Sequence, residues 1–209
     1  EAPYNNENQF KNHMNNALDI LEYYGLNALI FHVRTHNNAF YKSSLNPVAS
    51  WWASADFDVF DPLGWLIAET HKRGIEFHAW MNPYRVDRNR QVGEVPQENP
   101  QNDPNNLIYG STTILNPALP HVKEHIYKTV EEFANLYPTV DAVHFDDYFY
   151  VNTSEHPTSA NARRDHVTEM IEGVKNTLNS FNEANNTTIQ LGISPTGVWR
   201  NGSTNVVEY

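Results

Sequence analysis

The chain of 209 residues is long enough for one sizeable hydrophobic core, since a domain usually takes about 100–200 residues. Hydrophobic residues (40%) and aromatic residues (12%) are at levels typical of a globular protein, while 14 Lys and Arg against 25 Asp and Glu give a net charge of −11, which argues against nucleic acid as a partner. The lack of cysteine excludes disulfides, thiolate metal sites and a cysteine nucleophile, and no apolar run approaches the roughly 18 residues of a transmembrane segment.

The first third of the chain predicts two helices with a strand between them. Residues 7–24 carry apolar side chains at helical spacing and end at Gly25. The apolar run 26–34 predicts a strand buried on both faces, with His32 and Arg34 together on one face because they lie two residues apart. After a long aromatic-rich connection, Asp61-Pro62 has the residue types that begin a helix.

The middle of the chain repeats this pattern of strand, long connection and helix. Residues 75–82 predict a strand with His78, Trp80 and Asn82 on one face. The stretch 83–116 is rich in Asn, Pro and Gln and lacks useful periodicity, which is typical of a functional loop or of disorder. Asn116-Pro117 is expected to start a third helix.

Residues 141–150 predict a buried strand that ends in Asp146 and Asp147. His144 and Asp146 fall on one face of this strand, and a buried acid there is costly unless it is paired or hydrogen-bonded. Two interpretations remain open from this stretch alone: an Asp pair that caps a helix or forms salt bridges in a loop, or a catalytic carboxylate at the mouth of a barrel.

Residues 159–178 and 189–194 predict a fourth helix and a last strand, so helices alternate with single strands four times. This alternation predicts a parallel α/β sheet, and long connections after the strands with short ones after the helices favour a (β/α)8 TIM barrel. An open doubly wound sheet is the alternative, but no glycine-rich phosphate-binding motif follows any strand.

Four strands make only part of a barrel, because eight need roughly 250 residues. We therefore expect residues 1–209 to be a partial catalytic domain whose bare edge strands require further strands from the parent chain or a partner chain. The strands should follow each other in order, with one polar concave face made of His32, Arg34, His78, Trp80, Asn82, His144 and Asp146.

Six motifs run in order along the chain: NALIFHVR at 27–34, AFY at 39–41, DPL at 61–63, HKRGIEFHAWMNPYR at 71–85, HFDDYFY at 144–150 and GISPTGVWR at 192–200. Together they resemble the glycosyl hydrolase-like 10 family, a group of bacterial TIM-barrel glycosidases that act on surface glycans, with peptide-stripped peptidoglycan as one implicated substrate class. The resemblance implies that the four strands are the second to the fifth of the barrel. It also implies an extracellular or cell-envelope location, as a secreted protein or lipoprotein, although no signal peptide is visible in the sequence.

One position departs from the family pattern. Where the family usually has Gly-Asp before its Ala-x-Tyr motif, this chain has Asn37-Asn38, which supplies a hydrogen-bonding amide without a charge.

Glycoside hydrolysis needs two carboxyl groups that flank the scissile bond. Asp146 is the first candidate, because it follows a strand on the face that it shares with His144. Asp147 is the second candidate, although a structural acid that holds a loop or a helix N-terminus is the more expected role. Glu76 lies at the start of its strand, which is the wrong end of a barrel, so we expect the partner acid in the missing part.

The remaining candidates would bind sugar hydroxyls, acetamido groups, a carboxylate or a sugar ring. Arg34 could alternatively form a buried ion pair, for instance with Asp146, and any of the tryptophans could serve packing alone. The candidate substrate-binding residues are Arg34, His78, Trp80, Asn82, Tyr84, Arg85, His144, Tyr148 and Trp199.

Two other functions stay open at this point. His32, His78 and His144 stand at similar depths on successive strands and could hold zinc with Asp146, although the H-x-H pair of amidohydrolase-like barrels is missing. A non-catalytic glycan-binding barrel is favoured by Asn38 and by the missing second acid. In the main interpretation we expect a carbohydrate oligomer or polymer as the ligand and neither metal nor cofactor.

Overall fold

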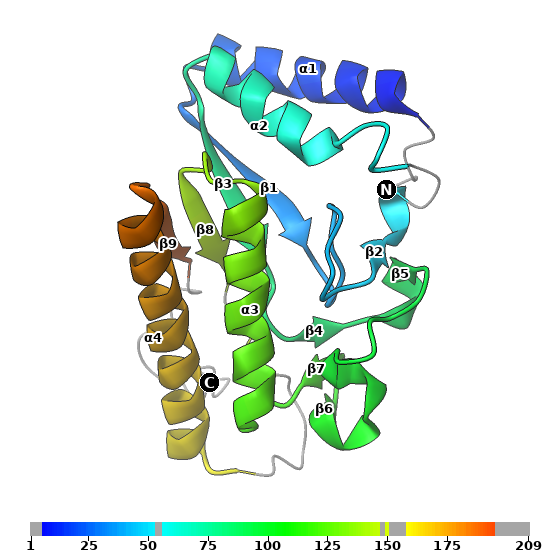
Figure 1. Cartoon of the computed structure of the whole chain (residues 1–209), viewed down its shortest axis with the longest axis vertical. Coiled ribbons are helices and arrows are strands. Elements are labelled where there is room, and N and C mark those ends of the chain that lie inside the picture. The colour runs from blue at the N-terminus through cyan, green and yellow to red at the C-terminus, as the bar shows by residue number, and fades with distance from the viewer. Residues whose placement is uncertain (1–5, 53–55, 147–148, 151–157, 195–209) are drawn as a thin grey trace, which may run out of the picture.

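A computed structural model describes residues 6–52, 56–146, 149–150 and 158–194, and it shows an α/β protein built on a parallel sheet (Figure 1). The sheet has the order β1-β3-β8-β9, so strands that follow each other along the chain are neighbours in space, as predicted. Its strands are β1 (Ala28–Arg34), β3 (Glu76–Met81), β8 (Ala142–Phe145) and β9 (Gln190–Ile193), and its helices are α1 (Glu7–Tyr23), α2 (Pro62–Lys72), α3 (Pro120–Leu136) and α4 (Ala160–Asn185).

Helix α2 begins where its capping residues predict. The Asp61 side chain accepts hydrogen bonds from the backbone N–H groups of Leu63 and Gly64, and Pro62 is the first helical residue. Gly74, with a φ of 70°, follows the helix and lets the chain turn directly into β3. No helix in the described ranges combines the length and the apolar character that are needed to cross a membrane.

The two later helices have different bounds from those predicted. Helix α3 begins at Pro120 rather than at Asn116, because the Asn116 side chain accepts a hydrogen bond from the Ala118 N–H and closes a turn before the helix. Helix α4 begins after Ser159 as predicted, but it continues to Asn185. Its last turns bury Phe181, and Asn186 ends the helix in the left-handed conformation with a φ of 53°.

The two long connections are folded rather than structureless, which corrects the prediction for residues 83–116. They contain the antiparallel pair β2-β5 and the antiparallel sheet β4-β7-β6, and four 3-10 turns lie among these strands. The strands are β2 (Val48–Ala49), β4 (Arg85–Val86), β5 (Gln91–Val92), β6 (Leu107–Tyr109) and β7 (Thr113–Leu115). The pairing of β2 with β5 joins the two connections beside the carboxyl end of β1.

The two faces of the main sheet differ in burial. Side chains on the helix side, among them Phe77, Ala79, Val143 and Phe145, are fully buried and form the core with α2 and α3. On the opposite face His32, Trp80 and His144 are only half-buried. Burial of the apolar set stabilises the fold at roughly 25 cal/mol per Å² of apolar area, and it fixes which face of each strand meets the helices.

Arg34 does not lie on the polar face, which corrects the prediction. The register between β1 and β3 shifts after His32, so Arg34 pairs with Met81 instead of continuing the row of His32 and Trp80. Met81 faces the helix side, and Arg34 is accordingly buried beside Ile126 and Val130 of α3. A β-bulge of this kind turns one side chain to the other face of a strand.

Candidate active site at the carboxyl ends of the sheet

One row of side chains crosses the polar face from edge to edge. The strand registers place His32, Trp80, His144 and Gly192 side by side. The His32 ring stacks on the Trp80 ring with a centroid distance of 3.8 Å and an angle of 3°. A Cβ on Gly192 would lie 2.9 Å from His144 Nδ1, so the glycine makes room for that imidazole, whose Nε2 lies 2.8 Å from Ser194 Oγ.

Asp146 follows β8 directly. It lies two residues beyond His144 on the same face, which is one level, or row of neighbouring residues, nearer the carboxyl ends of the strands. Its relative exposure is 6%. Trp80 Nε1 donates a hydrogen bond of 2.9 Å to Asp146 Oδ2. The buried Asn82 amide lies 3.2 Å from Oδ1 and 3.3 Å from Oδ2, as a donor to the carboxylate. Two N–H donors, one from Trp80 in β3 and one from Asn82 directly after it, fix the orientation of this carboxylate. The structure thus brings Asp146, Trp80 and Asn82 into contact.

Two imidazoles on this face, those of His32 and His144, have lowered pKa values. Burial, followed by the charges of His36 and Arg85, lowers the pKa of His32 to about 4. Burial and the nearby His78 also lower the pKa of His144, although Asp146 acts in the opposite direction. Neutral imidazoles near pH 7 can both donate and accept hydrogen bonds, which suits the hydroxyl groups of an uncharged ligand.

Three predicted residues take other positions. His78 is on the polar face two levels before Asp146, on the other side of the His32–Trp80–His144 row, with its Nε2 3.0 Å from Glu76 Oε2. Tyr84 is fully buried, and the pKa of its hydroxyl is raised well above the ordinary value by burial. Arg34 forms its hydrogen bonds with Asn side chains and backbone carbonyls, so the alternative role, an ion pair with Asp146, is not formed either.

Arg85 lies close to the site, since its charge contributes to the lowered pKa values of both His32 and His36. Beside the His32–Trp80 stack is a hollow of about 440 Å³. Its walls include Phe40 and Trp51. Aromatic walls with a few polar groups are typical of a ligand site.

Asn38 has a structural role in the loop after β1. Its Oδ1 accepts hydrogen bonds from Thr35 N, Thr35 Oγ1 and His36 N, each at 3.1 Å, and its amide donates to Arg90 O at 2.7 Å. Asn37, at the family's glycine position, has a φ of 53°, a left-handed conformation that Asn tolerates better than most residues. An amide oxygen at position 38 is therefore sufficient as the acceptor in this loop.

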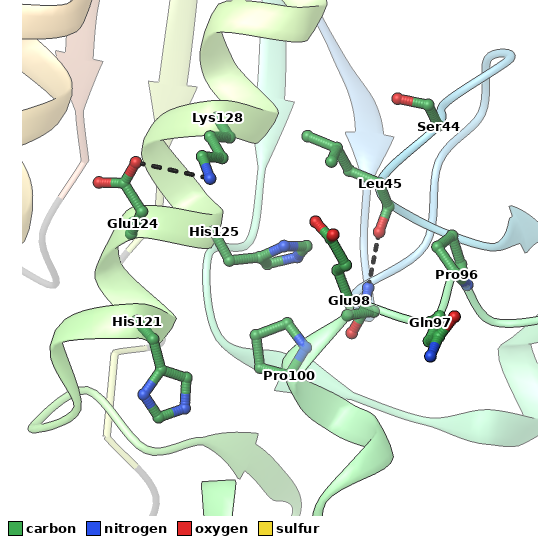
Figure 2. Close-up of a pocket in the computed structure, with 11 residues that line it drawn as sticks. Ser44, Leu45, Pro96, Gln97, Glu98, Pro100, His121, Glu124, His125 and Lys128 are labelled. Carbon is green, nitrogen blue, oxygen red and sulfur yellow. Dashed lines mark hydrogen bonds and ion pairs between the residues drawn. The ribbon is translucent and has the colours of Figure 1, made fainter.

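A second hollow, of about 410 Å³, lies between α3 and the loop around Pro100 (Figure 2). None of the predicted site residues lines it. Its His125 points toward the loop in Figure 2, and His125 Nε2 lies 3.3 Å from Asn37 Oδ1. Glu124 and Lys128 form a 3.8 Å ion pair at its exposed wall. This hollow is separate from the polar face of the sheet on which Asp146 lies.

Several predictions fall outside the described residues, namely those for Asp147, Tyr148 and Trp199. Within the described ranges no three His, Asp or Glu side chains gather as metal ligands, so His32, His78 and His144 do not form the zinc site of the alternative prediction. His32 is instead stacked on Trp80, and His144 contacts Ser194.

The sequence did not predict the loop residues that surround Trp80 and Arg34. His36 and Arg90 line the hollow beside Trp80, and Asn37 and Asn46 accept hydrogen bonds from Arg34. These loop residues have no periodicity that would place them on a face. The Asn37-Asn38 pair, where the family has Gly-Asp, was the one available signal.

The sequence has relatives among known proteins. Residues 3–161 match the model of the glycosyl hydrolase-like 10 family. The chain is 32% identical over 208 residues to glycosyl hydrolase YngK of Bacillus subtilis, covering 89% of this chain and 40% of that protein. It is 31% identical over 218 residues to glycosyl hydrolase DigH of Escherichia coli K12, covering 91% of this chain and 48% of that protein. The chain thus spans less than half the length of these two relatives.

Solved structures share the fold at low sequence identity. A hypothetical protein from Ruminiclostridium thermocellum has a TM-score of 0.55 at 11% identity, with 88% of this chain and 91% of that one covered. The α-galactosidase from Lactobacillus brevis has a TM-score of 0.51 at 14% identity, covering 88% of this chain and 24% of that one. The GH20 exo-β-N-acetylglucosaminidase from Vibrio harveyi has a TM-score of 0.51 at 16% identity, covering 80% and 31%. The likeness is to glycosidases with TIM-barrel-like folds, and it concerns the fold alone.

Proposed function

The chain belongs to the glycosyl hydrolase-like 10 family, and from this premise we propose that it carries part of a glycoside hydrolase active site with Asp146 as one of the two catalytic carboxylates. One observation carries the proposal: the Asp146 carboxylate lies at the carboxyl end of a parallel strand and accepts hydrogen bonds from Trp80 and Asn82. Catalytic groups of TIM barrels occupy this position, where strands end and loops begin.

The hydrogen bonds to Asp146 support one of the two carboxylate roles. Because Trp80 and Asn82 donate to its oxygens, the Asp146 carboxylate is held in one orientation, in which it would attack the anomeric carbon, activate water or stabilise the positive charge of the transition state. The other carboxyl group would protonate the leaving oxygen. A separation of about 5–5.5 Å between the two would give retention and about 6.5–9.5 Å inversion.

The substrate in this proposal is a bacterial surface or cell-wall glycan, with peptide-stripped peptidoglycan as one candidate. Trp80 offers an indole that can pack against a sugar ring, and His144 and Arg85 can hydrogen-bond to its substituents. The hollow beside Trp80 and His32 has room for part of a sugar unit. An extracellular or cell-envelope location belongs to the same proposal.

The proposal also includes the completion of the barrel. The four strands would be the second to the fifth of eight, and the remaining strands would come from the parent chain or a partner chain. The bare edges of β1 and β9, with Ile30 and Ile193 partly exposed, support this arrangement.

The test compares variants of the intact parent protein on a polymeric bacterial glycan. Asp146→Asn keeps the shape and removes the charge, so kcat should fall by several orders of magnitude, and Asp147→Asn should lose much less. Glu76→Gln is the matched control. Glu76 is the first residue of β3, at the end of the strands opposite to Asp146, so this change should leave kcat unaffected. If Asp146→Asn cleaves the glycan at a near-normal rate, Asp146 is structural. Glycan binding by wild type without any cleavage would favour the non-catalytic alternative.

A further inference from the structure

Arg34 is a buried cation in neutral surroundings. Its relative exposure is 1%, and the space left around it, beside Met81, Ile126 and Phe145, is about 10 Å³, the lower limit for a single water molecule. Every acceptor of its hydrogen bonds is a neutral oxygen. Burial lowers the pKa of Arg34 to about 10, so the guanidinium stays charged near pH 7.

The guanidinium joins two segments at the carboxyl end of the sheet, the loop after β1 and the residues directly after β3. Nη1 donates to the backbone carbonyls of Asn82 and, at 3.1 Å, of Pro83, directly after β3. Nη2 donates to Asn37 Oδ1, and Nε donates to Asn46 Oδ1 at 3.3 Å, both in the loop after β1. Because the planar fork offers donors in fixed directions, it holds these segments in one relative position.

The contact with Asn82 leads directly to Asp146. Asn82 N donates to Arg34 O at 2.7 Å while Arg34 Nη1 donates to Asn82 O, so the two residues are joined in both directions. Asn82 Oδ1 accepts from Arg85 N at 2.9 Å, which leaves the amide nitrogen directed at the Asp146 carboxylate. The backbone of Asn82 is thus set by Arg34 and its side chain sets Asp146.

We propose that Arg34 is a positioning residue, which holds the Asn82–Pro83 backbone and through it the orientation of the Asp146 carboxylate. The inference rests on the proposed function, because it assigns Arg34 a part in the action of Asp146. It replaces the predicted role in substrate binding, since a sealed guanidinium has no surface for a sugar.

The main test is Arg34→Lys in the intact parent protein. Lysine keeps the charge but cannot reach the Asn82, Asn37 and Asn46 oxygens together, so Asp146 should lose its fixed orientation. A shift of about 1 Å in a catalytic group can cost about a hundredfold in rate. We expect kcat on the glycan to fall about 10- to 100-fold while KM changes less than about threefold. Arg73→Lys is the matched control, because Arg73 also has several hydrogen bonds but joins α2 to α1.

A double-mutant cycle separates positioning from general stability. If Arg34 acts through Asn82, adding Arg34→Lys to Asn82→Ala should lower kcat by no more than about threefold beyond Asn82→Ala alone. If the fold-loss of kcat in the double variant equals the product of the two single losses, the inference is overturned. A folded Arg34→Lys protein with wild-type kcat would also overturn it. Should Arg34→Lys fail to fold, Asn46→Ala removes the Nε acceptor of Arg34 together with the Asn46 amide bonds to Ser43 and Thr129, leaves the Nη1 and Nη2 bonds in place, and should give a smaller loss of kcat.

A readout without activity distinguishes failure of this inference from failure of the proposed function. The Trp80 indole N–H donates to Asp146, and its resonance in 15N-tryptophan-labelled protein can be assigned with Trp80→Phe. Arg34→Lys should shift this resonance, whereas Arg73→Lys should not. A shifted resonance together with an active Asp146→Asn variant would refute catalysis by Asp146 and keep the positioning role. An unmoved resonance would refute the positioning role itself.

Discussion

At the residue scale, Asn38 illustrates how the contacts of a side chain decide its role. Its side-chain carbonyl oxygen accepts three hydrogen bonds within the turn after β1, and the amide carries no charge. An amide at this position is therefore sufficient for the loop structure, without the charge of the Asp that the resemblance predicts here. The turn depends on the side-chain oxygen at position 38 and needs no charge there.

Asn38→Ala should lower the free energy of unfolding by about 2–3 kcal/mol, because the buried N–H groups of Thr35 and His36 lose their acceptor. Asn38→Asp keeps that acceptor but loses the amide donor to Arg90 O, so it should lower the free energy of unfolding by about 1–2 kcal/mol. Urea titrations of the three proteins measure both effects. Equal stability of wild type and Asn38→Ala would show that the turn does not depend on this oxygen.

The buried histidines predict a dependence of stability on pH. Burial, followed by the charges of Arg34 and Lys128, lowers the pKa of His125 to about 3 from an ordinary value of 6.5. Below pH 6.5 the unfolded chain takes up a proton that the folded chain does not. The free energy of unfolding should therefore fall as the pH drops from 6.5 toward 3, by at most about 1.4 kcal/mol per pH unit for this group.

The measurement is urea unfolding at several pH values between 7.5 and 4. His125→Gln keeps an N–H donor near Asn37 and has no proton to take up, so its stability should fall less steeply with acid than that of wild type. His32, with its pKa lowered to about 4, contributes in the same direction in both proteins. Parallel pH profiles of the two proteins would contradict the prediction.

At the element scale, the packing of α3 against α4 depends on a glycine. A Cβ on Gly173 would lie 2.1 Å from Tyr127 Cζ, so the ring rests against the helix backbone, and Tyr127 OH donates to Glu169 O at 3.1 Å. The glycine costs helix propensity, about 1 kcal/mol relative to alanine. The close approach of the two helices explains its presence within α4.

Gly173→Ala should destabilise the protein by about 1–3 kcal/mol, because the added methyl group displaces the Tyr127 ring. Asn176→Ala is the control, since Asn176 is exposed on the same helix and its replacement should be neutral or slightly stabilising. Chemical denaturation gives both values. In a Tyr127→Ala background the Gly173→Ala change should become stabilising, and a loss of stability there would show that the clash lies elsewhere.

At the scale of the whole molecule, the main sheet ends in two bare edges. β1 and β9 each have one neighbour in the described sheet, and Ile30 of β1 is 48% exposed. Unpaired strand edges beside apolar side chains promote association between chains. The edges are therefore places where the rest of a barrel, or another chain, would add strands.

The 209-residue chain by itself should self-associate in a concentration-dependent way, and a protein that carries the proposed completing strands should not. Ile30→Lys should reduce the association, because lysine at a strand edge opposes pairing. Val59→Lys, at a loop position that is 82% exposed, is the matched control and should leave it unchanged. Sedimentation velocity over a concentration series measures the effect. A monomeric isolated chain that unfolds cooperatively would refute this prediction.

The sequence by itself determined the alternation of strands and helices, the sequential parallel sheet and the position of Asp146 at a strand end. These features depend on local rules: apolar periodicity, Asp61 as a helix cap and glycine after a helix. The six motifs also determined the family. The place of Trp80 and Asn82 on the face of Asp146 followed from the two-residue repeat alone.

Only the tertiary structure decided which side chains meet outside that repeat. The shift of register after His32 depends on the pairing of β1 with β3, and it moved Arg34 from the predicted site into the core. The small sheets in the long connections likewise exist because segments far apart in sequence pair with each other, as β2 does with β5. Such pairing is set by the free energy of the whole packed molecule, so no local pattern could have predicted it.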